Sequence, residues 1–298
     1  MIHRPSDDLL FMRPPGYRLP TTTHVGTVRL QVADLTRSVA WYERVLGLVM
    51  LRQRGSVASL GPAGGTLVLV ELHEHPGARA APLRGQLGLF HYALLLPDEP
   101  ALGRFISHLG SIGERAGASD HLVSQALYLR DPDGLGIEVY ADRPRRTWQQ
   151  QGRELRMDTR PLDLGRVVAA AGGTAWTGMP ADTVMGHVHL QVGDVEGSVP
   201  FYHAALGLDK TVWSYPGALF LSAGGYHHHL GVNEWAGPAA RPAPPGDARL
   251  LEWTLVLPSP ADVAAALASL AAGGYRADDG RVNDPWGTVL HLVPSGQG

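Results

Sequence analysis

Glu138, Tyr128 and His121 lie within one short stretch, residues 118–143, and their side chains could share a chemical site. The runs LVSQALYL and GIEVY are rich in strand-forming residues, and the turn signal DPDG, which begins at Asp131, separates them. This pattern predicts a hairpin, with Tyr128 and Glu138 as cross-strand neighbours on one face. A carboxylate on that face meets either water or a cation, and this stretch alone leaves both readings open.

Length and composition limit the classes of protein. The chain has 298 residues, 44% of them hydrophobic and 18% charged, which is enough for two ordinary globular domains. Its net charge of −3 gives no general attraction to nucleic acid or to an anionic membrane, and we expect neither as a partner. The first residues lack the apolar core of a signal peptide, so we expect a cytoplasmic protein. With no cysteine and 14 histidines, any metal would be held by imidazole and carboxylate.

An internal repeat organises the chain. The segment GTVRLQVADLTRSVAWYERVLGL begins at Gly26, and GHVHLQVGDVEGSVPFYHAALGL begins at Gly186; 12 of the 23 positions match. The segments that begin at Leu89 and Leu250 form a second matching pair, and the DPDG turn has its counterpart, DPWG, at Asp284. The chain is therefore predicted to contain two half-chain copies.

Each half divides into two units that start near residues 26, 88, 186 and 249. Every unit begins with an alternating strand, continues into a helical stretch and ends in strand-like runs, which predicts four βαβββ modules. Asp34 is the expected N-cap of the first helix, and Gly47 is its expected end. The predicted organisation is an N-terminal arm (1–23), a first repeat (24–143), a connecting segment (144–183) and a second repeat (184–298).

Four such modules resemble the vicinal oxygen chelate superfamily, which includes glyoxalases, bleomycin-resistance proteins and type I extradiol dioxygenases. The stretches LFHYALLLP, SDHLVSQALYLRDPDGLGIEVYADRPRRTW, GHVHLQVGDV and ALFLSAGGYHHHLGVNEWAG are most similar to bacterial catechol 2,3-dioxygenases of the CatE type. The resemblance implies an α+β fold in which the modules pair into two half-open mixed β-barrels with helices outside. It also implies metal ligands on the first strand of each paired module and on the last strand of one.

Six positions are then equivalent by the repeat: Thr27, His91, His187 and Glu252 on first strands, and Glu138 and His291 on last strands. Modules 1 and 2 together would offer only two ligands. Modules 3 and 4 would offer His187, Glu252 and His291. Modules 2 and 3 offer His91, Glu138 and His187, the order that the resemblance implies, and this choice pairs module 2 with 3 and module 1 with 4.

The resemblance also implies catalytic partners. A Tyr lies ten residues before the Glu ligand in the family, as Tyr128 does here, and His121 lies two residues from an expected His position. The family also carries a His pair on the last strand of the neighbouring module, and in the run YHHHLGVN His228 is the better match for its acid–base member. In a regular strand, His227 and His229 would point away from the face of His228. His189 and Gln191 are candidate residues of the cleft wall, and Asn233 and Trp235 are candidate substrate contacts. The Pro-rich run AGPAARPAPPGD, from Ala236, is a candidate lid.

Two histidines and a carboxylate with open coordination positions suit a non-haem Fe(II) oxygenase, with Mn(II) as the other candidate ion. The implied activity is extradiol cleavage of a catechol-type aromatic diol by O2, in a protein that we expect to be a homo-oligomer. Two alternatives remain from the sequence. One is a metal-dependent lyase or isomerase of the glyoxalase kind, and the other is a metal-free binding protein for a small molecule.

Overall fold

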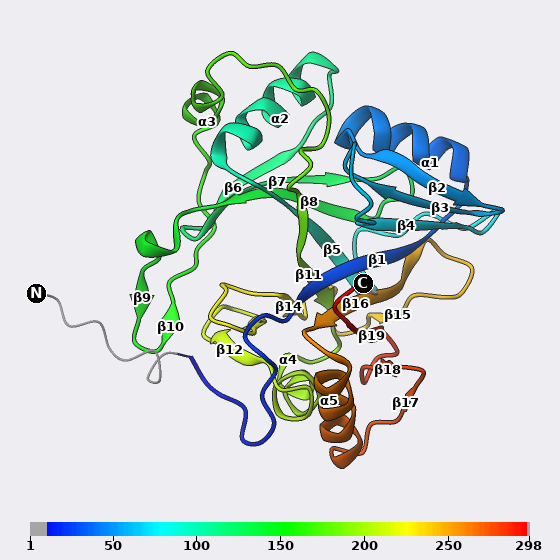
Figure 1. Ribbon diagram of the computed structural model, residues 1–298, viewed down its shortest axis with the longest axis vertical. Helices are drawn as coiled ribbons and strands as arrows, with labels where there is room; N and C mark the ends of the chain where they lie inside the picture. Colours follow the sequence, from blue (N-terminus) through cyan, green and yellow to red (C-terminus); the bar gives the residue numbers. More distant parts are fainter. Residues whose placement is uncertain (1–10, 297–298) are drawn as a thin grey trace, which may run out of the picture.

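The computed structural model describes residues 11–296, so the first ten residues of the predicted arm lie outside the described part. Two large mixed sheets form the centre, and the helices lie on the outside (Figure 1). The first sheet contains β1 (His24–Val32), β2 (Val49–Arg54), β3 (Val57–Gly61), β4 (Val70–Glu74), β16 (Arg249–Leu257), β17 (Ala277–Asp278), β18 (Arg281–Asn283) and β19 (Val289–Pro294). Its order is β17-β18-β19-β16-β1-β4-β3-β2.

The second sheet has the same plan. It contains β5 (Gln86–Leu96), β6 (Gly117–Asp120), β7 (Ser124–Arg130), β8 (Gly136–Asp142), β11 (Val184–Gln191), β12 (Asp209–Val212), β13 (Ala218–Ser222) and β14 (Leu230–Asn233). Its order is β12-β13-β14-β11-β5-β8-β7-β6, and the short β15 (Arg241–Pro242) pairs with β5 outside this path. Each sheet therefore combines strands from both halves of the chain.

One helical segment follows the first strand of every module. These segments are α1 (Leu35–Trp41) with the π-turn η2 (Tyr42–Leu46), α2 (Glu99–Ser111), α4 (Val195–Val199) with the π-turn η4 (Pro200–Ala205), and α5 (Pro260–Ala272). The connecting segment holds the 3-10 turn η3 (Arg145–Thr147), the hairpin β9 (Gln150–Gln151) and β10 (Glu154–Leu155), and α3 (Leu164–Ala170). The predicted α+β fold of four βαβββ modules is confirmed. No helix within residues 11–296 is long and apolar enough to span a bilayer.

Short side chains define where the helices begin. Asp34 accepts a hydrogen bond from the backbone N–H of Arg37, and Gly47 ends the same helical segment in the left-handed region at φ +68°, as expected from the sequence. The equivalent N-caps of the other modules are Asp98, Asp194 and Ser259. Each first strand is thus followed at once by a helix that returns over the sheet.

The two faces of the second sheet have opposite character. Tyr92 and Leu94 on β5 belong to the main hydrophobic core, together with Phe105 of α2. Ala93, between them, belongs to a separate small cluster with Tyr140. Because side chains alternate along a strand, one face of the sheet packs under the helices, and the other face does not belong to this core.

Candidate metal centre and substrate pocket

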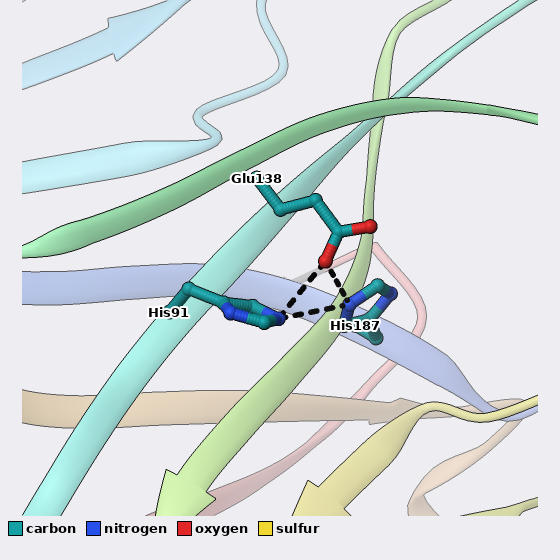
Figure 2. Close-up of side chains that lie close together, drawn as sticks. All are labelled: His91, Glu138 and His187. Atoms are coloured by element: carbon teal, nitrogen blue, oxygen red, sulfur yellow. Dashed lines mark hydrogen bonds and ion pairs between the residues drawn. The ribbon is translucent and has the colours of Figure 1, made fainter. Parts of the chain in front are cut away.

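Three side chains from three strands meet on the inner face of the second sheet. The Nε2 atoms of His91 (β5) and His187 (β11) lie 2.9 Å and 3.1 Å from Oε2 of Glu138 (β8), and 3.4 Å from each other (Figure 2). All three residues are buried. No other group of three or more such ligands occurs in the described part of the chain. The trio therefore forms the candidate metal centre.

The distances within this trio fit a bound divalent cation. Two ligand atoms at right angles around one ion, each at about 2.0–2.2 Å, are separated by about 3 Å. Burial lowers the pKa of His91 and of His187, which favours the neutral imidazole that a metal requires. Burial opposes ionisation of Glu138, but the two histidines outweigh it and hold the pKa of Glu138 well below its usual value. The trio thus supplies two neutral nitrogens and one anionic oxygen.

Strand register brings the three ligands together. Ala93 on β5 pairs with Glu138 on β8 and with His187 on β11, and His91 pairs with His189. The β5–β11 ladder is interrupted between Met185 and His187, so Gly186 is an extra residue on β11. A Cβ on Gly186 would collide with the Tyr140 side chain, which explains why glycine is needed there.

A cavity of about 290 Å³ opens beside the trio. His91 and Glu138 lie in its wall, and its remaining lining is largely aromatic or apolar. The wall also includes Phe90, Tyr128, Tyr215, Phe220, His228 and Trp235. At its rim, residues 157–159 of the connecting segment reach across, and Thr159 Oγ1 lies 3.0 Å from the Tyr215 hydroxyl. The pocket is large enough for one substituted aromatic ring.

Tyr128 and His121 lie together at this pocket, as the sequence predicts. Tyr128 pairs with Glu138 across the hairpin. His121 Nε2 lies 2.6 Å from the Tyr128 hydroxyl, and His121 Nδ1 lies 2.9 Å from the carbonyl oxygen of Asp158. A carbonyl only accepts, so Nδ1 of His121 donates, and the bare Nε2 of the neutral ring accepts from Tyr128. Burial and Glu138 raise the pKa of Tyr128 well above 10, which keeps this hydroxyl protonated.

His228 also lines the pocket, and its ring centroid lies 4.1 Å from that of His187. The strand alternation expected for His227–His229 is wrong, however. Strand β14 begins only at Leu230, so His227–His229 precede it and do not alternate as strand residues. His227 lies against His228, with 2.7 Å between their Nδ1 atoms, while the His229 ring packs on Tyr226.

Other candidate wall residues differ in their outcome. His189 and Trp235 line the pocket, and Nε2 of the buried His189 ring has no hydrogen-bond partner among residues 11–296. Gln191 lies outside it and lines a separate small cavity. The Pro-rich run from Ala236 contributes no lining residue, so the lid interpretation is wrong. Instead Ala236 and Ala240 pack on Leu87 at the start of β5.

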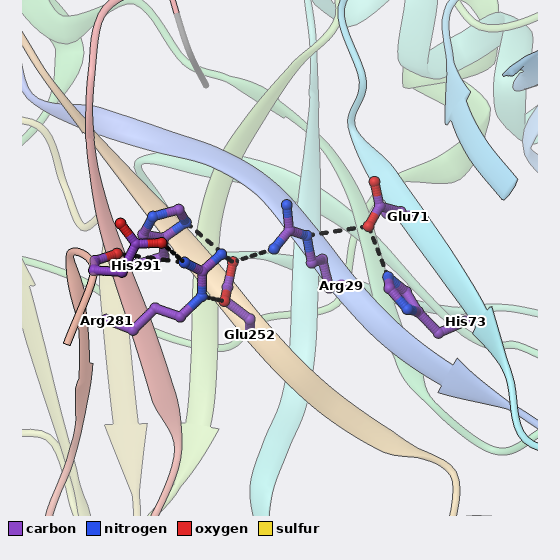
Figure 3. Close-up of polar contacts among 7 residues, drawn as sticks. Arg29, Glu71, His73, Glu252, Arg281 and His291 are labelled. Carbon is purple, nitrogen blue, oxygen red and sulfur yellow. Dashed lines mark hydrogen bonds and ion pairs between the residues drawn. The ribbon is translucent and has the colours of Figure 1, made fainter. Parts of the chain in front are cut away.

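The first sheet carries no second copy of the trio. Glu252 (β16) accepts from Arg29 (β1) at 2.8 Å and from Arg281 (β18) at 2.6 Å, and His291 (β19) lies 3.1 Å from it (Figure 3). His187 belongs to the other sheet. The alternative grouping of His187, Glu252 and His291 is therefore wrong, because two arginines already neutralise the carboxylate that it would use. The grouping of modules 1 and 2 fails as well, since Thr27 lies on β1 and donates to the Val68 carbonyl.

Comparison with known proteins identifies the family. The sequence model of the Glyoxalase/Bleomycin resistance protein/Dioxygenase superfamily matches residues 23–139 and 184–292. The chain belongs to this superfamily.

Individual relatives are consistent with that assignment. A Bacillus subtilis (strain 168) protein named Catechol-2,3-dioxygenase is 42% identical over 271 residues, which are 88% of this chain and 94% of the relative. A crystal structure from Bacillus subtilis subsp. subtilis str. 168 aligns over 95% of this chain and 87% of its own, with a TM-score of 0.64 and 14% identity. Glyoxalase I from Zea mays aligns over 91% and 92%, with a TM-score of 0.52 and 17% identity. The two structures support the fold alone.

Several residues of the pocket were not identified from the sequence. Phe90, Phe220 and Tyr215 have the ordinary appearance of core aromatics, and Met157 and Asp158 come from an irregular segment without periodicity. Phe90 could have been found, because it directly precedes the first-strand ligand His91. Nothing in the sequence indicates that the connecting segment returns to the site.

The trio makes a direct prediction for metal retention. Glu138→Ala removes the only anionic ligand, so the variant should lose most of its Fe(II) after anaerobic loading and desalting, as measured by elemental analysis. Glu252→Ala, which removes a carboxylate from the arginine cluster of the first sheet, is the matched control and should retain the metal. Full iron content in Glu138→Ala would show that the trio is not the metal centre.

Buried histidines also predict how stability depends on pH. The pKa of each of seven histidines is lowered in the fold: His91, His187, His189, His203, His228, His229 (to about 3) and His291. Each therefore binds a proton in the unfolded chain before it does so in the folded one. The corresponding stability is present above the unfolded pKa of about 6.5 and is lost as the pH falls below it.

Asp131, whose pKa is raised to about 7, and Asp284, whose pKa is also raised, act in the opposite direction. The effect of these two carboxyl groups on the free energy of unfolding does not cancel that of the seven histidines. Urea unfolding of the metal-free protein should give a free energy of unfolding that falls by at least about 1 kcal/mol per pH unit below about pH 6.5. Stability that stays constant or rises over this range would contradict the buried neutral state of these rings.

Proposed function

We propose that this protein is a non-haem Fe(II)-dependent extradiol dioxygenase that cleaves a catechol-type aromatic diol with O2. The observation that carries the proposal is the convergence of His91, Glu138 and His187 beside an aromatic cavity, whose wall contains His91 and Glu138. Two neutral imidazoles and one carboxylate are the ligand set that such oxygenases use. The relative named Catechol-2,3-dioxygenase, at 42% identity over most of both chains, supports the same activity.

His91, His187 and Glu138 would hold the ion from one side. Fe(II) bound there would offer open coordination positions to both diol oxygens and to O2, and would favour the ionised diol. Mn(II) accepts the same ligands and is the other candidate. The protein's own contribution is to keep the three ligand atoms convergent and dry, which burial of all three residues accomplishes.

The aromatic ring of the substrate would lie between the aromatic walls of the cavity. The centroid of the Phe90 ring lies 5.1 Å from that of His91 and 5.6 Å from that of Trp235, and Phe220 lies 4.9 Å from His228. These rings offer stacking and edge contacts and exclude water from the reacting carbons. Tyr215 and Thr159 close the rim and would meet the side of the ring farthest from the ligands.

Tyr128 and His121 would orient the diol. The Tyr128 hydroxyl donates to His121 Nε2, so its oxygen lone pairs remain available to a diol hydroxyl. Because the pKa of Tyr128 is raised, this hydroxyl stays protonated at neutral pH and does not compete with Glu138 as an anion. Tyr128 and His121 together would position one substrate oxygen beside the three ligands.

His228, which lies in the cavity wall beside the His187 ring, would move a proton during the reaction. Burial and the neighbouring His187 hold the pKa of His228 well below 6.5, so the ring is neutral and would accept a proton from a diol hydroxyl and return it later in the reaction. Its Nδ1 is engaged by His227, which leaves Nε2 as the atom that acts at the substrate.

Lyase or isomerase activity on the same scaffold is the outcome to test against. A glyoxalase-like enzyme would use the ion without consuming O2, and a binding protein would need no ion. The His91–Glu138–His187 trio argues against a metal-free binding protein, and Tyr128 and His228 in the cavity wall favour oxygen chemistry over isomerisation. Oxygen uptake with a panel of substituted catechols by the iron-loaded protein distinguishes the three, because only the dioxygenase consumes O2 and forms a yellow ring-cleavage product.

The role of His228 gives a specific prediction. His228→Ala should keep its iron and still bind a catechol, but should lose turnover by about 10²–10⁴-fold, since positioned acid–base groups contribute this much. His229→Ala is the control from the same triplet, because the His229 ring packs on Tyr226 away from the pocket. Equal turnover in His228→Ala and the unmodified protein would contradict the proton-transfer role.

A further inference from the structure

A chain of hydrogen bonds leads away from the pocket behind His228. His228 Nδ1 lies 2.7 Å from His227 Nδ1, and His227 Nε2 lies 2.9 Å from Oδ1 of Asp142. His227 is fully buried, whereas the Asp142 side chain is 27% exposed. Asp142 is the last residue of β8, the strand that also carries Glu138. The chain thus joins the end of a ligand strand to the pocket histidine.

The chemistry of these groups gives the chain a direction. A carboxylate can only accept, so the proton between Asp142 and His227 lies on His227 Nε2. A neutral His227 then has a bare Nδ1, which accepts from Nδ1–H of His228. A neutral His228 with its proton on Nδ1 has a bare Nε2, and no residue among 11–296 hydrogen-bonds to that atom. The carboxylate therefore determines the tautomer of a ring two hydrogen bonds away.

We propose that Asp142 and His227 are positioning residues that fix His228 as the Nδ1–H tautomer, with the bare Nε2 presented to the pocket. The inference deepens the proposed function, on which its catalytic consequence rests. A ring with this tautomer is ready to accept a proton at Nε2, whereas the opposite tautomer would present an N–H and could not. Asp142 and His227 do not touch the substrate and act only through His228.

The surroundings hold this arrangement in one orientation. The Tyr226 hydroxyl donates to Oδ1 of Asp142 at 3.3 Å and lies 2.6 Å from the Tyr140 hydroxyl. Burial raises the pKa of both tyrosines well above 10, so both remain donors. The Tyr226 ring stacks on His227 with 4.0 Å between centroids, and Trp148 packs at 5.4 Å. The Tyr226 hydroxyl and His227 Nε2–H thus both donate to the one carboxylate.

His229 provides an internal contrast. Its Nδ1 accepts from the backbone N–H of Ala223 at 3.2 Å, which requires that this ring carry its proton on Nε2. Burial lowers the pKa of His229 to about 3, so it stays neutral under ordinary conditions. Two adjacent histidines are therefore expected to hold opposite tautomers, a difference that does not depend on activity.

Nuclear magnetic resonance of full-length protein with isotope-labelled histidine tests the proposal. Long-range proton–nitrogen spectra, recorded at about pH 8 in the metal-free state and again with diamagnetic Zn(II), distinguish protonated from bare ring nitrogens. Loss of signals in His228→Gln and His229→Gln assigns the two rings. We expect Nδ1–H for His228 and Nε2–H for His229. An Nε2–H tautomer for His228 would overturn the proposal, since it would mean that His227 donates at both nitrogens.

Three variants test the cause. Asp142→Leu removes the acceptor and His227→Phe removes the intermediate ring, so both should release His228 into a mixture of tautomers. Asp142→Asn retains an acceptor oxygen without the charge and should keep the Nδ1–H form more fully than Asp142→Leu. Asp98→Asn, at the N-cap of α2, is the matched control and should leave the His228 signals unchanged. Unchanged Nδ1–H in a folded Asp142→Leu and His227→Phe would overturn the proposal. Should either variant not fold, the spectrum of the unmodified protein and Asp142→Asn still decide.

Kinetics separate this inference from the proposed function. In the iron-loaded protein, Asp142→Leu should lower kcat about 10–100-fold, the usual effect of removing a group that orients a catalytic one, with unchanged iron content and little change in KM. Asp142→Asn should restore part of the loss. If no catechol is turned over by the unmodified protein, the proposed function fails while the tautomer result stands. If turnover is present and Asp142→Leu matches it, the positioning role is wrong.

Discussion

The antiparallel ladder between β5 and β11 sets the register in which His91 lies opposite His189, and Ala93 opposite His187. Side chains alternate along both strands, so a slip of one residue would turn a ligand into the hydrophobic core and bring an apolar residue such as Tyr92 to the site. The register also gathers two imidazoles and a carboxylate in a buried position. Buried groups of this kind are costly unless they are paired, and a shared cation satisfies all three at once.

The two sheets solve the same electrostatic problem in opposite ways. The repeat makes the ligand positions of the second sheet equivalent to Thr27, Glu252 and His291 of the first. There, Glu252 is held between Arg29 and Arg281, so the protein itself provides the positive charge. In the second sheet no arginine or lysine reaches Glu138 within the described residues, and its partners are two neutral histidines. One scaffold therefore carries a self-neutralised cluster and a site that can accept an ion.

Local chemistry in the sequence predicted much of this arrangement. Helix caps at Asp34 and Gly47, and the tight turn after Asp131, are short-range effects, and the strand pairing of Tyr128 with Glu138 follows directly from the turn. The repeat located the equivalent ligand positions, and resemblance selected among the groupings. The division into an arm, two repeats and a connecting segment stays a prediction.

What the sequence did not predict depends on long-range geometry or on irregular backbone. His228 was identified by resemblance, but it was distinguished from His227 and His229 by an alternation that does not apply, because the segment is not a strand. The contact between His227 and Asp142 joins residues 85 positions apart, and no periodicity encodes it. Residues 157–159 reach the pocket from a segment with little regular structure. Such contacts arise from how finished elements pack, which single-residue preferences do not specify.

We propose that the second sheet alone holds one divalent ion, through His91, His187 and Glu138. Crystals of the protein loaded anaerobically with Fe(II) test it most directly, through anomalous difference maps recorded on both sides of the iron absorption edge. We expect one strong peak within about 2.0–2.3 Å of the two Nε2 atoms and of a Glu138 oxygen, and none beside Glu252. A peak at Glu252 and His291, or no peak at the trio in fully loaded protein, would contradict it.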